Sequence, residues 1–418
     1  MSSPIHIGFL ARDFLKWGGG VWFIQNLLRG LATLSAAEVR ITVLVPSDHT
    51  ARLLARRFAD RLKRAVLHPS QARHHLFGGA VPERSIWTRG VEQLNAIVPD
   101  LIVFDGSDED LIRRCSELNI DVLLPVFSPP EKSSIPWVGY LYDCQHKHYP
   151  QFFDSKEIAS RDRAFDNMLN QGSVVFANAQ AVISDLRRFF PEVKAELFSL
   201  PFAPLILEEE LAATVRDWQE AQHSVTGGAP YFIVCNQFWV HKDHATAFRA
   251  FARFTEDPAR RNWCLVCTGL TQDFRVPDHF GELTALVAEL GIAERVMFTG
   301  YVERSRQQSL LYGATALLQP TLFEGGPGGG AASDAMALGV PCLLSDISVN
   351  RELSDPLATF FRVSDPESLA IAMEEVVRHP PSRPAAAQLL QNSRDHARHL
   401  GETLRTLAEK ALAARNLL

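Results

Sequence analysis

Short apolar runs of the β type alternate with segments of helical periodicity along the whole chain, and this alternation limits the possible folds most. The pattern is typical of parallel sheets that are covered by helices on both faces, and it predicts an α/β fold with doubly wound sheets. The predicted strands are Ile5–Leu10, Val39–Val45, Leu101–Phe104, Val122–Val126, Trp137–Leu141, Val174–Ala177, Tyr231–Val234, Trp263–Cys267, Val296–Phe298, Ala316–Leu318 and Pro341–Leu344. The predicted helices are Val21–Leu34, Ala179–Phe190, Glu208–Gln222, His244–Phe254, Gly281–Leu290, Arg304–Tyr312, Ala331–Leu338 and Pro366–Val377.

The length of 418 residues exceeds what one ordinary hydrophobic core supports. Two prolines in Leu200–Pro204 fix an extended connection near the middle of the chain. We therefore expect two Rossmann-like domains, residues 1–202 and 203–392, with a ligand cleft at the carboxyl ends of the strands. Residues 393–418 are predicted to form a helix whose apolar face suits either a membrane surface or another face of the protein.

Composition and charge exclude several classes of protein. A net charge of −6 argues against a nucleic-acid partner bound through a broadly basic surface. The chain has neither an apolar stretch of about 18 residues, the length that spans a bilayer, nor a recognisable signal peptide. The six cysteines are scattered, and Cys264 and Cys267 would point to opposite faces of one strand. We expect a reduced, cytoplasmic protein without a resident metal, and the sequence makes no prediction of oligomeric state.

The run from Gly325 to Gly330 is the strongest functional feature, because five of its six residues are glycine. It lies between a predicted strand and a predicted helix, with Glu324 before it and Asp334 after it. Glycines let backbone N–H groups approach an anion, and the helix N-terminus adds partial positive charge. Carboxylates suit the hydroxyls of a sugar or ribose. The plainer alternative is a flexible connector, with Asp334 as an acid favoured by the helix dipole.

Three other polar segments follow predicted strands. Cys235–His244 carries Lys242 before a helix, which is an unfavourable place for a cation unless the cation binds something. Leu141–Pro150 carries one Asp and two His that could ligate a metal if partners came from elsewhere in the chain. Trp17–Val21 holds three consecutive glycines, which could equally form an ordinary turn.

The glycine run and its tail, Ala335–Pro341, resemble the Glu-x7-Glu signature of the retaining GT-B glycosyltransferases of family 4. The resemblance implies that Glu324 contacts the donor sugar and that Asp334 binds the ribose. It also implies that loop amides hold the diphosphate, namely those of Gly326, Gly328, Gly329 and Gly330. The eighth residue after Glu324 is Ala332, so Asp334 comes two positions late, and this indicates a divergent branch of the family.

The same resemblance extends to the other segments. Lys242 stands where the family has a phosphate-binding Lys, while Asn236 or Gln237 stands where it has an Arg. The family's cleft histidine is carried over to His146. Its N-terminal glycine loop and its base-reading backbone groups are carried over to Gly19, Gly20, Tyr301 and Val302. A last helix that returns to the first domain is also implied.

Asp105–Asp110 contains Asp-x-Asp, the metal motif of GT-A, the other main glycosyltransferase fold. A helix start explains this segment better, with Ser107 as the N-cap and Asp110 at the third position of the helix. Acidic residues in the first turn are also favoured by the helix dipole. The segment therefore gives no reason to expect a GT-A metal site.

The resemblance implies transfer of a sugar from a nucleoside diphosphate sugar to an acceptor hydroxyl, with retention and without metal or other cofactor. Lys242, the loop amides and the helix dipole would stabilise the leaving diphosphate, Glu324 would orient the sugar, and His146 would lie beside the reacting face. The acceptor would be a glycan, a lipid-linked molecule or a small molecule in glycan or glycoconjugate assembly. Loops such as His68–Arg89 would select it, and peripheral membrane contact is left open.

Three alternatives share these features. A sugar-nucleotide epimerase or hydrolase would use the same donor site without an acceptor. A non-catalytic nucleotide-sugar-binding subunit would explain the missing Arg and the displaced second acid. A nicotinamide dehydrogenase would need a dinucleotide fingerprint, which the sequence lacks.

Overall fold

The computed structural model describes residues 3–16, 18–47, 86–131, 133–273 and 275–415. Residues 68–85 of the predicted acceptor loop His68–Arg89 lie outside the described residues, and so does Trp17. The strands are β1 (Ile5–Leu10), β2 (Val39–Pro46), β3 (Leu101–Phe104), β4 (Val122–Val126), β5 (Trp137–Tyr140), β6 (Val174–Ala177), β7 (Glu196–Ser199), β8 (Tyr231–Cys235), β9 (Cys264–Thr268), β10 (Val296–Gly300), β11 (Leu317–Gln319), β12 (Cys342–Ser345) and β13 (Ala358–Phe361).

The helices that the structure describes connect these strands. They are α1 (Gly18–Leu31), α4 (Ile86–Ile97), α5 (Asp108–Leu118), α6 (Gln145–His148), α7 (Ser155–Gln171), α8 (Gln180–Phe189), α9 (Glu208–Thr226), α10 (His244–Phe254), α11 (His279–Glu289), α12 (Arg304–Gly313), α13 (Gly329–Ala337), α14 (Pro366–Arg378) and α15 (Ala386–Arg415). A short 3-10 turn, η4 (Val240–Lys242), precedes α10. Within the described residues, no helix is both long enough and apolar enough to cross a bilayer.

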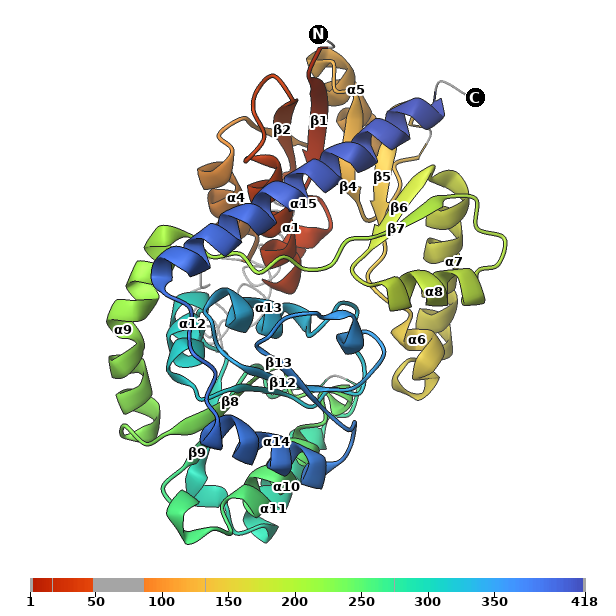
Figure 1. Ribbon diagram of the computed structural model, residues 1–418. Helices are drawn as coiled ribbons and strands as arrows, with labels where there is room; N and C mark the ends of the chain where they lie inside the picture. Colours follow the sequence, from red (N-terminus) through yellow and green to blue (C-terminus); the bar gives the residue numbers. More distant parts are fainter. Residues whose placement is uncertain (1–2, 17, 48–85, 132, 274, 416–418) are drawn as a thin grey trace, which may run out of the picture. The chain divides into compact units, whose positions relative to one another are not determined.

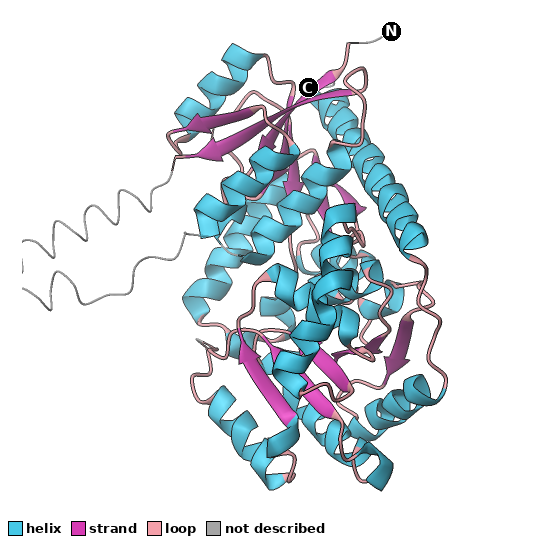
Figure 2. Ribbon diagram, turned by 90° about the vertical axis from the view of Figure 1, so that its left-hand side faces the viewer, coloured by secondary structure: helices cyan, strands magenta, loops and turns pink. Residues whose placement is uncertain are grey.

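The strands form two sheets, and the described strand pairs are parallel. One sheet has the order β3-β2-β1-β4-β5-β6-β7 and the other the order β10-β9-β8-β11-β12-β13. Both orders reverse direction after their first three strands, as Rossmann-type sheets do. The prediction of two doubly wound α/β sheets is therefore confirmed. Figure 2 shows the magenta strands flanked by cyan helices.

Contacts divide the chain into two compact units, residues 1–139 with 401–418, and residues 140–400. The domain boundaries predicted after residues 202 and 392 stay predictions. In the first unit, the C-terminal part of α15 packs on α1 at two glycines: a Cβ added to Gly401 would meet the Gly30 carbonyl oxygen at 2.2 Å. Leu404 and Leu407 are buried there, so the helix predicted for the end of the chain packs on the first unit, as expected. Its apolar face is covered by protein.

The six-stranded sheet of the second unit has a separate apolar core on each face. Helices α10, α11 and α14 cover one face with residues such as Phe248, Val287 and Leu369. Helices α12 and α13 cover the other face with residues such as Leu310 and Ala335. Figure 1 shows α13 and α14 on opposite sides of this sheet. The order of the sheet reverses between β8 and β11, and at such a reversal the loops after the strands separate and leave a crevice for a ligand.

The sequence analysis predicted eleven strands, all of which are present, and missed two. Both missed strands, β7 and β13, lie at sheet edges and consist mostly of exposed or partly buried residues, so they lack a continuous buried apolar run. The helix start at residue 107 is also confirmed, because the Ser107 side chain accepts the backbone N–H of Asp110. The Asp-x-Asp of this segment therefore belongs to a capped helix.

Candidate functional site

The segments that follow β8 and β11 come together at the point where the sheet order reverses. The His241 carbonyl oxygen accepts the backbone N–H of Leu322 at 2.8 Å and the Thr321 hydroxyl at 3.1 Å. Further along, the Ser345 hydroxyl donates to the Thr321 carbonyl oxygen at 2.6 Å, and the Asn350 amide donates to the Ser345 carbonyl oxygen at 2.9 Å. Buried polar contacts thus fix the loops of three neighbouring strands to one another.

Lys242 and Glu324, which the sequence analysis selected independently, form an ion pair at this point. The Lys242 ammonium donates to Glu324 Oε1 at 2.6 Å, and the two side chains are 13% and 9% exposed. Gln319, the last residue of β11, donates its side-chain amide to the same oxygen at 2.8 Å. The carboxylate is therefore held from two sides, and the charge of Lys242 is largely offset.

Asn236 and Gln237 differ in position. The Asn236 amide donates to Gln319 Oε1 at 2.7 Å and is buried, whereas Gln237 is exposed. Asn236 therefore orients Gln319, which in turn orients Glu324. The sequence analysis missed Gln319, although a polar residue that ends the apolar run Leu317–Gln319 at the carboxyl edge of a sheet is a usable signal.

Some backbone N–H groups of the glycine loop, which the sequence analysis assigned to the diphosphate, donate hydrogen bonds within the protein instead. Gly328 is the N-cap of α13 with φ +66°, a conformation that favours glycine, and its N–H donates to Asn350 Oδ1 at 2.8 Å. The N–H of Gly329 donates to the Gly326 carbonyl oxygen at 2.9 Å. The N–H groups of Gly330 and Ala331 lie in the first turn of the helix, where helical geometry offers them no partner. They are the groups best suited to an anion.

Two of the glycines allow close approach of other segments of the same unit. A Cβ at Gly325 would meet the Tyr142 carbonyl oxygen at 2.7 Å. A Cβ at Gly326 would lie 2.4 Å from the ring of Phe202 and 2.9 Å from Asn178 Cβ. Part of the glycine content therefore serves packing, which a flexible connector would not require.

Asp334, the predicted ribose ligand, is placed in a buried ion pair. Its two carboxylate oxygens accept from the Arg304 guanidinium at 2.7 and 2.8 Å, and its side chain is 7% exposed. Burial acts to lower the pKa of Arg304, but the Asp334 carboxylate outweighs it and holds that pKa above its ordinary value. In this arrangement Asp334 ties α13 to α12, and its role as a ribose ligand stays a prediction.

His146, the predicted cleft histidine, is enclosed by protein. Its side chain is fully buried, its Nε2 bonds Asp162 at 3.0 Å, and its ring packs against Phe153 and Phe165. Burial lowers the pKa of His146. The sequence predicted a histidine facing the sugar, whereas the His146 side chain is buried against Phe153 and Phe165, and its role beside the sugar stays a prediction.

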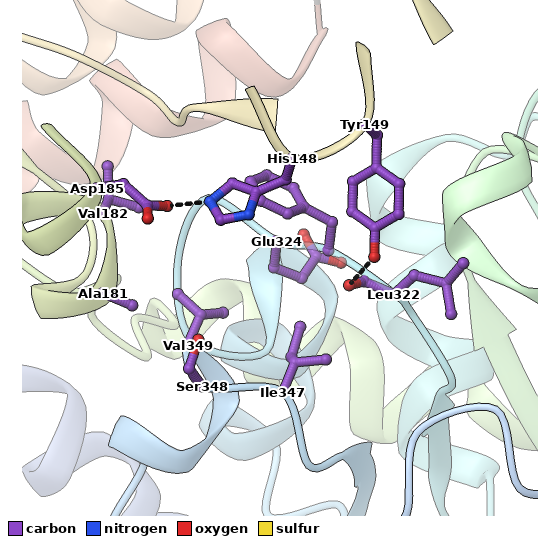
Figure 3. Close-up of a pocket in the computed structure, with 11 residues that line it drawn as sticks. His148, Tyr149, Ala181, Val182, Asp185, Leu322, Glu324, Ile347, Ser348 and Val349 are labelled. Atoms are coloured by element: carbon purple, nitrogen blue, oxygen red, sulfur yellow. Dashed lines mark hydrogen bonds and ion pairs between the residues drawn. The ribbon is translucent and has the colours of Figure 1, made fainter. Parts of the chain in front are cut away.

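His148, one helical half-turn further on, lines a pocket of about 250 Å³ that also contains Glu324. Its Nε2 bonds Asp185 at 2.6 Å, and Tyr149 donates to the Leu322 carbonyl oxygen at 3.3 Å (Figure 3). His146 and His148 bond different aspartates, and the described part of the chain holds no group of three or more His, Cys, Asp or Glu side chains that could bind a metal ion. The other lining residues are Ala181, Val182, Phe323, Ile347, Ser348 and Val349.

Asp143 is a further acidic group beside the loop. Its side chain would touch a Cβ at Gly325, and its Oδ1 accepts the N–H of Gln145 at 2.9 Å. Burial raises the pKa of Asp143, the Gln145 bond lowers it, and among the nearby charges Glu324 raises it while Lys242 lowers it. The sequence analysis noticed this residue only as a possible metal ligand.

We expect Asp143→Asn to raise the melting temperature at neutral pH by a few degrees. The raised pKa means that the native state binds this proton more tightly than the unfolded chain does. The stabilisation from that proton is complete below the unfolded pKa of about 4 and is lost as the pH rises through the native pKa. Thermal unfolding from pH 4 to pH 8 should show a gap between variant and wild type that opens with pH. A gap that is constant with pH would contradict this assignment.

The remaining predicted residues lie at element ends. Gly19 and Gly20 belong to the first turn of α1, which begins at Gly18, three residues before the predicted start. Tyr301 and Val302 directly follow β10, and Tyr301 is 59% exposed. These positions agree with the expected local structure, and the donor contacts assigned to them stay predictions.

Residues 215–396 match the family described as glycosyl transferases group 1. The matched segment contains Lys242, Gln319, Glu324 and the whole glycine loop. The chain is a GT-B glycosyltransferase. No curated protein sequence matches it.

Solved structures share the fold of the glycosyltransferase at low sequence identity. Sucrose-phosphate synthase from Thermosynechococcus elongatus is 16% identical, with 100% of this chain and 98% of that chain covered and a TM-score of 0.57. A glycosyltransferase from Rickettsia africae is 10% identical, with coverages of 99% and 98% and a TM-score of 0.60. HepE from Anabaena, solved in complex with UDP, is 15% identical, with coverages of 99% and 100% and a TM-score of 0.52. These likenesses concern the fold.

Proposed function

We propose that this glycosyltransferase moves a sugar from a nucleoside diphosphate sugar to an acceptor hydroxyl. The observation that carries the proposal is the Lys242–Glu324 pair, which lies at the switch point of a Rossmann-type sheet beside a helix N-terminus. A leaving diphosphate needs positive charge, which Lys242 and the first turn of α13 supply. A donor sugar needs a fixed hydrogen-bond acceptor, which Glu324 supplies.

The donor sugar would occupy the pocket that Glu324 shares with His148 and Ser348. Polar groups there suit sugar hydroxyls, and the apolar side chains of Val182 and Val349 suit the face of a sugar ring. The amides of Gly330 and Ala331 would bind the diphosphate. Support for a uridine nucleotide comes from HepE, whose structures contain UDP, and UDP with glucose.

We further propose retention at the anomeric carbon and independence of metal ions. The support for retention is the resemblance of Phe323–Gly339 to the family 4 signature. The support for metal independence is that the Lys242 ammonium and the N-terminus of α13 offer positive charge to a diphosphate without a metal ion. The acceptor would be a glycan, a lipid-linked molecule or a small molecule.

The test is a panel of UDP-, GDP-, ADP- and dTDP-sugars, in which the release of nucleoside diphosphate is measured with and without acceptor mixtures and EDTA. We expect release that depends on acceptor and persists in EDTA, and a product whose anomeric configuration by NMR matches the donor. Release without acceptor would indicate a hydrolase, binding without release would indicate a non-catalytic subunit, and loss of release in EDTA would refute metal independence.

A further inference from the structure

The pocket that contains Glu324 is small, with a volume of about 250 Å³. Sites for drug-sized ligands have volumes of about 300–1,000 Å³, so this pocket suits one sugar ring and not a whole nucleoside diphosphate sugar. Its walls come from the end of α6, from α8, from the segment after β11 and from the loop after β12. If the proposed function holds, on which this inference rests, the side chains of these walls distinguish one donor sugar from another.

Two carboxylates line the pocket, and each is paired. Glu324 accepts from the Lys242 ammonium at 2.6 Å, so these two charges offset each other. Asp185 accepts from His148 Nε2 at 2.6 Å, and the two side chains are only 19% and 33% exposed. Figure 3 shows His148 turned toward Asp185. Whether or not the imidazole is protonated, the His148–Asp185 pair brings no net positive charge to the pocket.

The pocket also has no cation of its own among the described residues that line it. Arg187 and Arg188 on α8, and Arg351 after β12, are close to the pocket residues in sequence, but none of the three is among those lining residues. Arg351 donates to Asp346 at 3.5 Å. An anionic group that entered the pocket would therefore meet two carboxylates and no cation that is not already paired, which is an unfavourable place for a negative charge.

A hydroxyl and a carboxylate differ in what they can do beside Asp185. A sugar hydroxyl can donate to the Asp185 carboxylate, and it can either donate to His148 Nδ1 or accept from it. The Ser348 hydroxyl, which also lines the pocket, can bond a hydroxyl in both directions as well. An ionised carboxylate only accepts, so it cannot bond Asp185 and is repelled by its charge. Because the pocket is small, a carboxylate on the sugar would lie near Asp185 whichever way the ring is turned.

We propose that this pocket selects donors with an uncharged sugar over donors whose sugar carries a carboxylate, and that Asp185 is the residue that makes the distinction. Glu324 contributes less to it, because the Lys242 ammonium offsets its charge. The selection combines a favourable bond to a hydroxyl with a repulsive contact against a carboxylate, and specific sites commonly use both.

The test is the affinity of the full chain for matched donors, measured by titration calorimetry. The nucleotide is first chosen as the one that binds most tightly among UDP, GDP, ADP and dTDP. On that nucleotide, glucose is compared with glucuronate, galactose with galacturonate and mannose with mannuronate, because the members of each pair differ only at C6. For the pair that contains the best-bound hexose, we expect the wild type to bind the hexose roughly 100-fold more tightly than the hexuronate.

Variants of Asp185 assign the effect to this residue. Asp185→Asn removes the charge and should reduce the preference for the hexose by roughly tenfold, whereas Asp185→Glu keeps the charge and should keep most of the preference. The affinity for the nucleoside diphosphate without a sugar should not change in either variant. The matched control is Asp162→Asn, because Asp162 also bonds a histidine, His146 at 3.0 Å, and is not among the residues that line the pocket. It should keep the wild-type preference.

Thermal unfolding of each variant shows whether a changed affinity reflects a changed fold. A wild type that binds a nucleoside diphosphate but binds no hexose more tightly than its hexuronate would overturn the inference and leave the donor site intact. An unchanged preference in Asp185→Asn, or the same loss of preference in Asp162→Asn, would overturn the role of Asp185. A wild type that binds none of the four diphosphates would overturn the proposed function, and the inference would fall with it.

Discussion

Lys242→Met should reduce the rate of sugar transfer by roughly 10²- to 10⁴-fold, because the departing diphosphate loses its nearest ammonium. The substitution should also destabilise the second unit. Glu324 would keep only the Gln319 bond among its two described partners, and a largely buried carboxylate without its cation costs about 3–5 kcal/mol. The rate of nucleoside diphosphate release and urea unfolding measure the two effects.

A double variant separates the two effects. Lys242→Met with Glu324→Gln removes both charges, so it should recover most of the lost stability and none of the lost rate. Lys147→Met is the matched control: Lys147 is 24% exposed and pairs with Asp162 at 2.7 Å, so the chemical change and the surroundings are similar. If the double variant regained transfer along with stability, Lys242 would be a structural residue and not a catalytic one.

Arg304→Met should destabilise the second unit by about 2–4 kcal/mol, since it leaves the Asp334 carboxylate buried without its cation. This loss of stability is smaller than that expected for a fully buried ion pair, because the Arg304 side chain is 31% exposed. Donor affinity should fall with stability, because Asp334 lies in α13, whose first turn is proposed to bind the diphosphate. Urea unfolding and calorimetric titration with the donor that the panel identifies would measure both.

The same pair distinguishes two roles for Asp334. If it only ties α13 to α12, then Arg304→Met with Asp334→Leu should recover most of the stability and most of the donor affinity. If instead Asp334 binds the ribose, the double variant should fold well and still bind the donor poorly. The bidentate geometry favours the first outcome.

The sequence was sufficient for the fold because the buried strands are continuous apolar runs. β8 and β12 are buried along almost their whole length, and such runs are recognisable without structure. β7 and β13 were missed because edge strands bury only one side. Glu324 and Lys242 were each selected because each follows a strand at the carboxyl edge of the sheet, but their pairing was not predicted.

The rest of the site depends on tertiary contacts that spacing does not encode. His146 and His148 are two residues apart, and only the packing of α6 determines that His148 lines the pocket. Asn350 holds the amide of Gly328 from 22 residues away, and Arg304 holds Asp334 from 30 residues away. These partners took up groups that the sequence analysis had assigned to the ligand.

The most direct measurement is a crystal structure of the chain with the nucleoside diphosphate that it binds. The account predicts that the diphosphate lies at the N-terminus of α13, within hydrogen-bond distance of the amides of Gly330 and Ala331 and of the Lys242 ammonium. A diphosphate bound elsewhere, with the Lys242–Glu324 pair untouched, would contradict it.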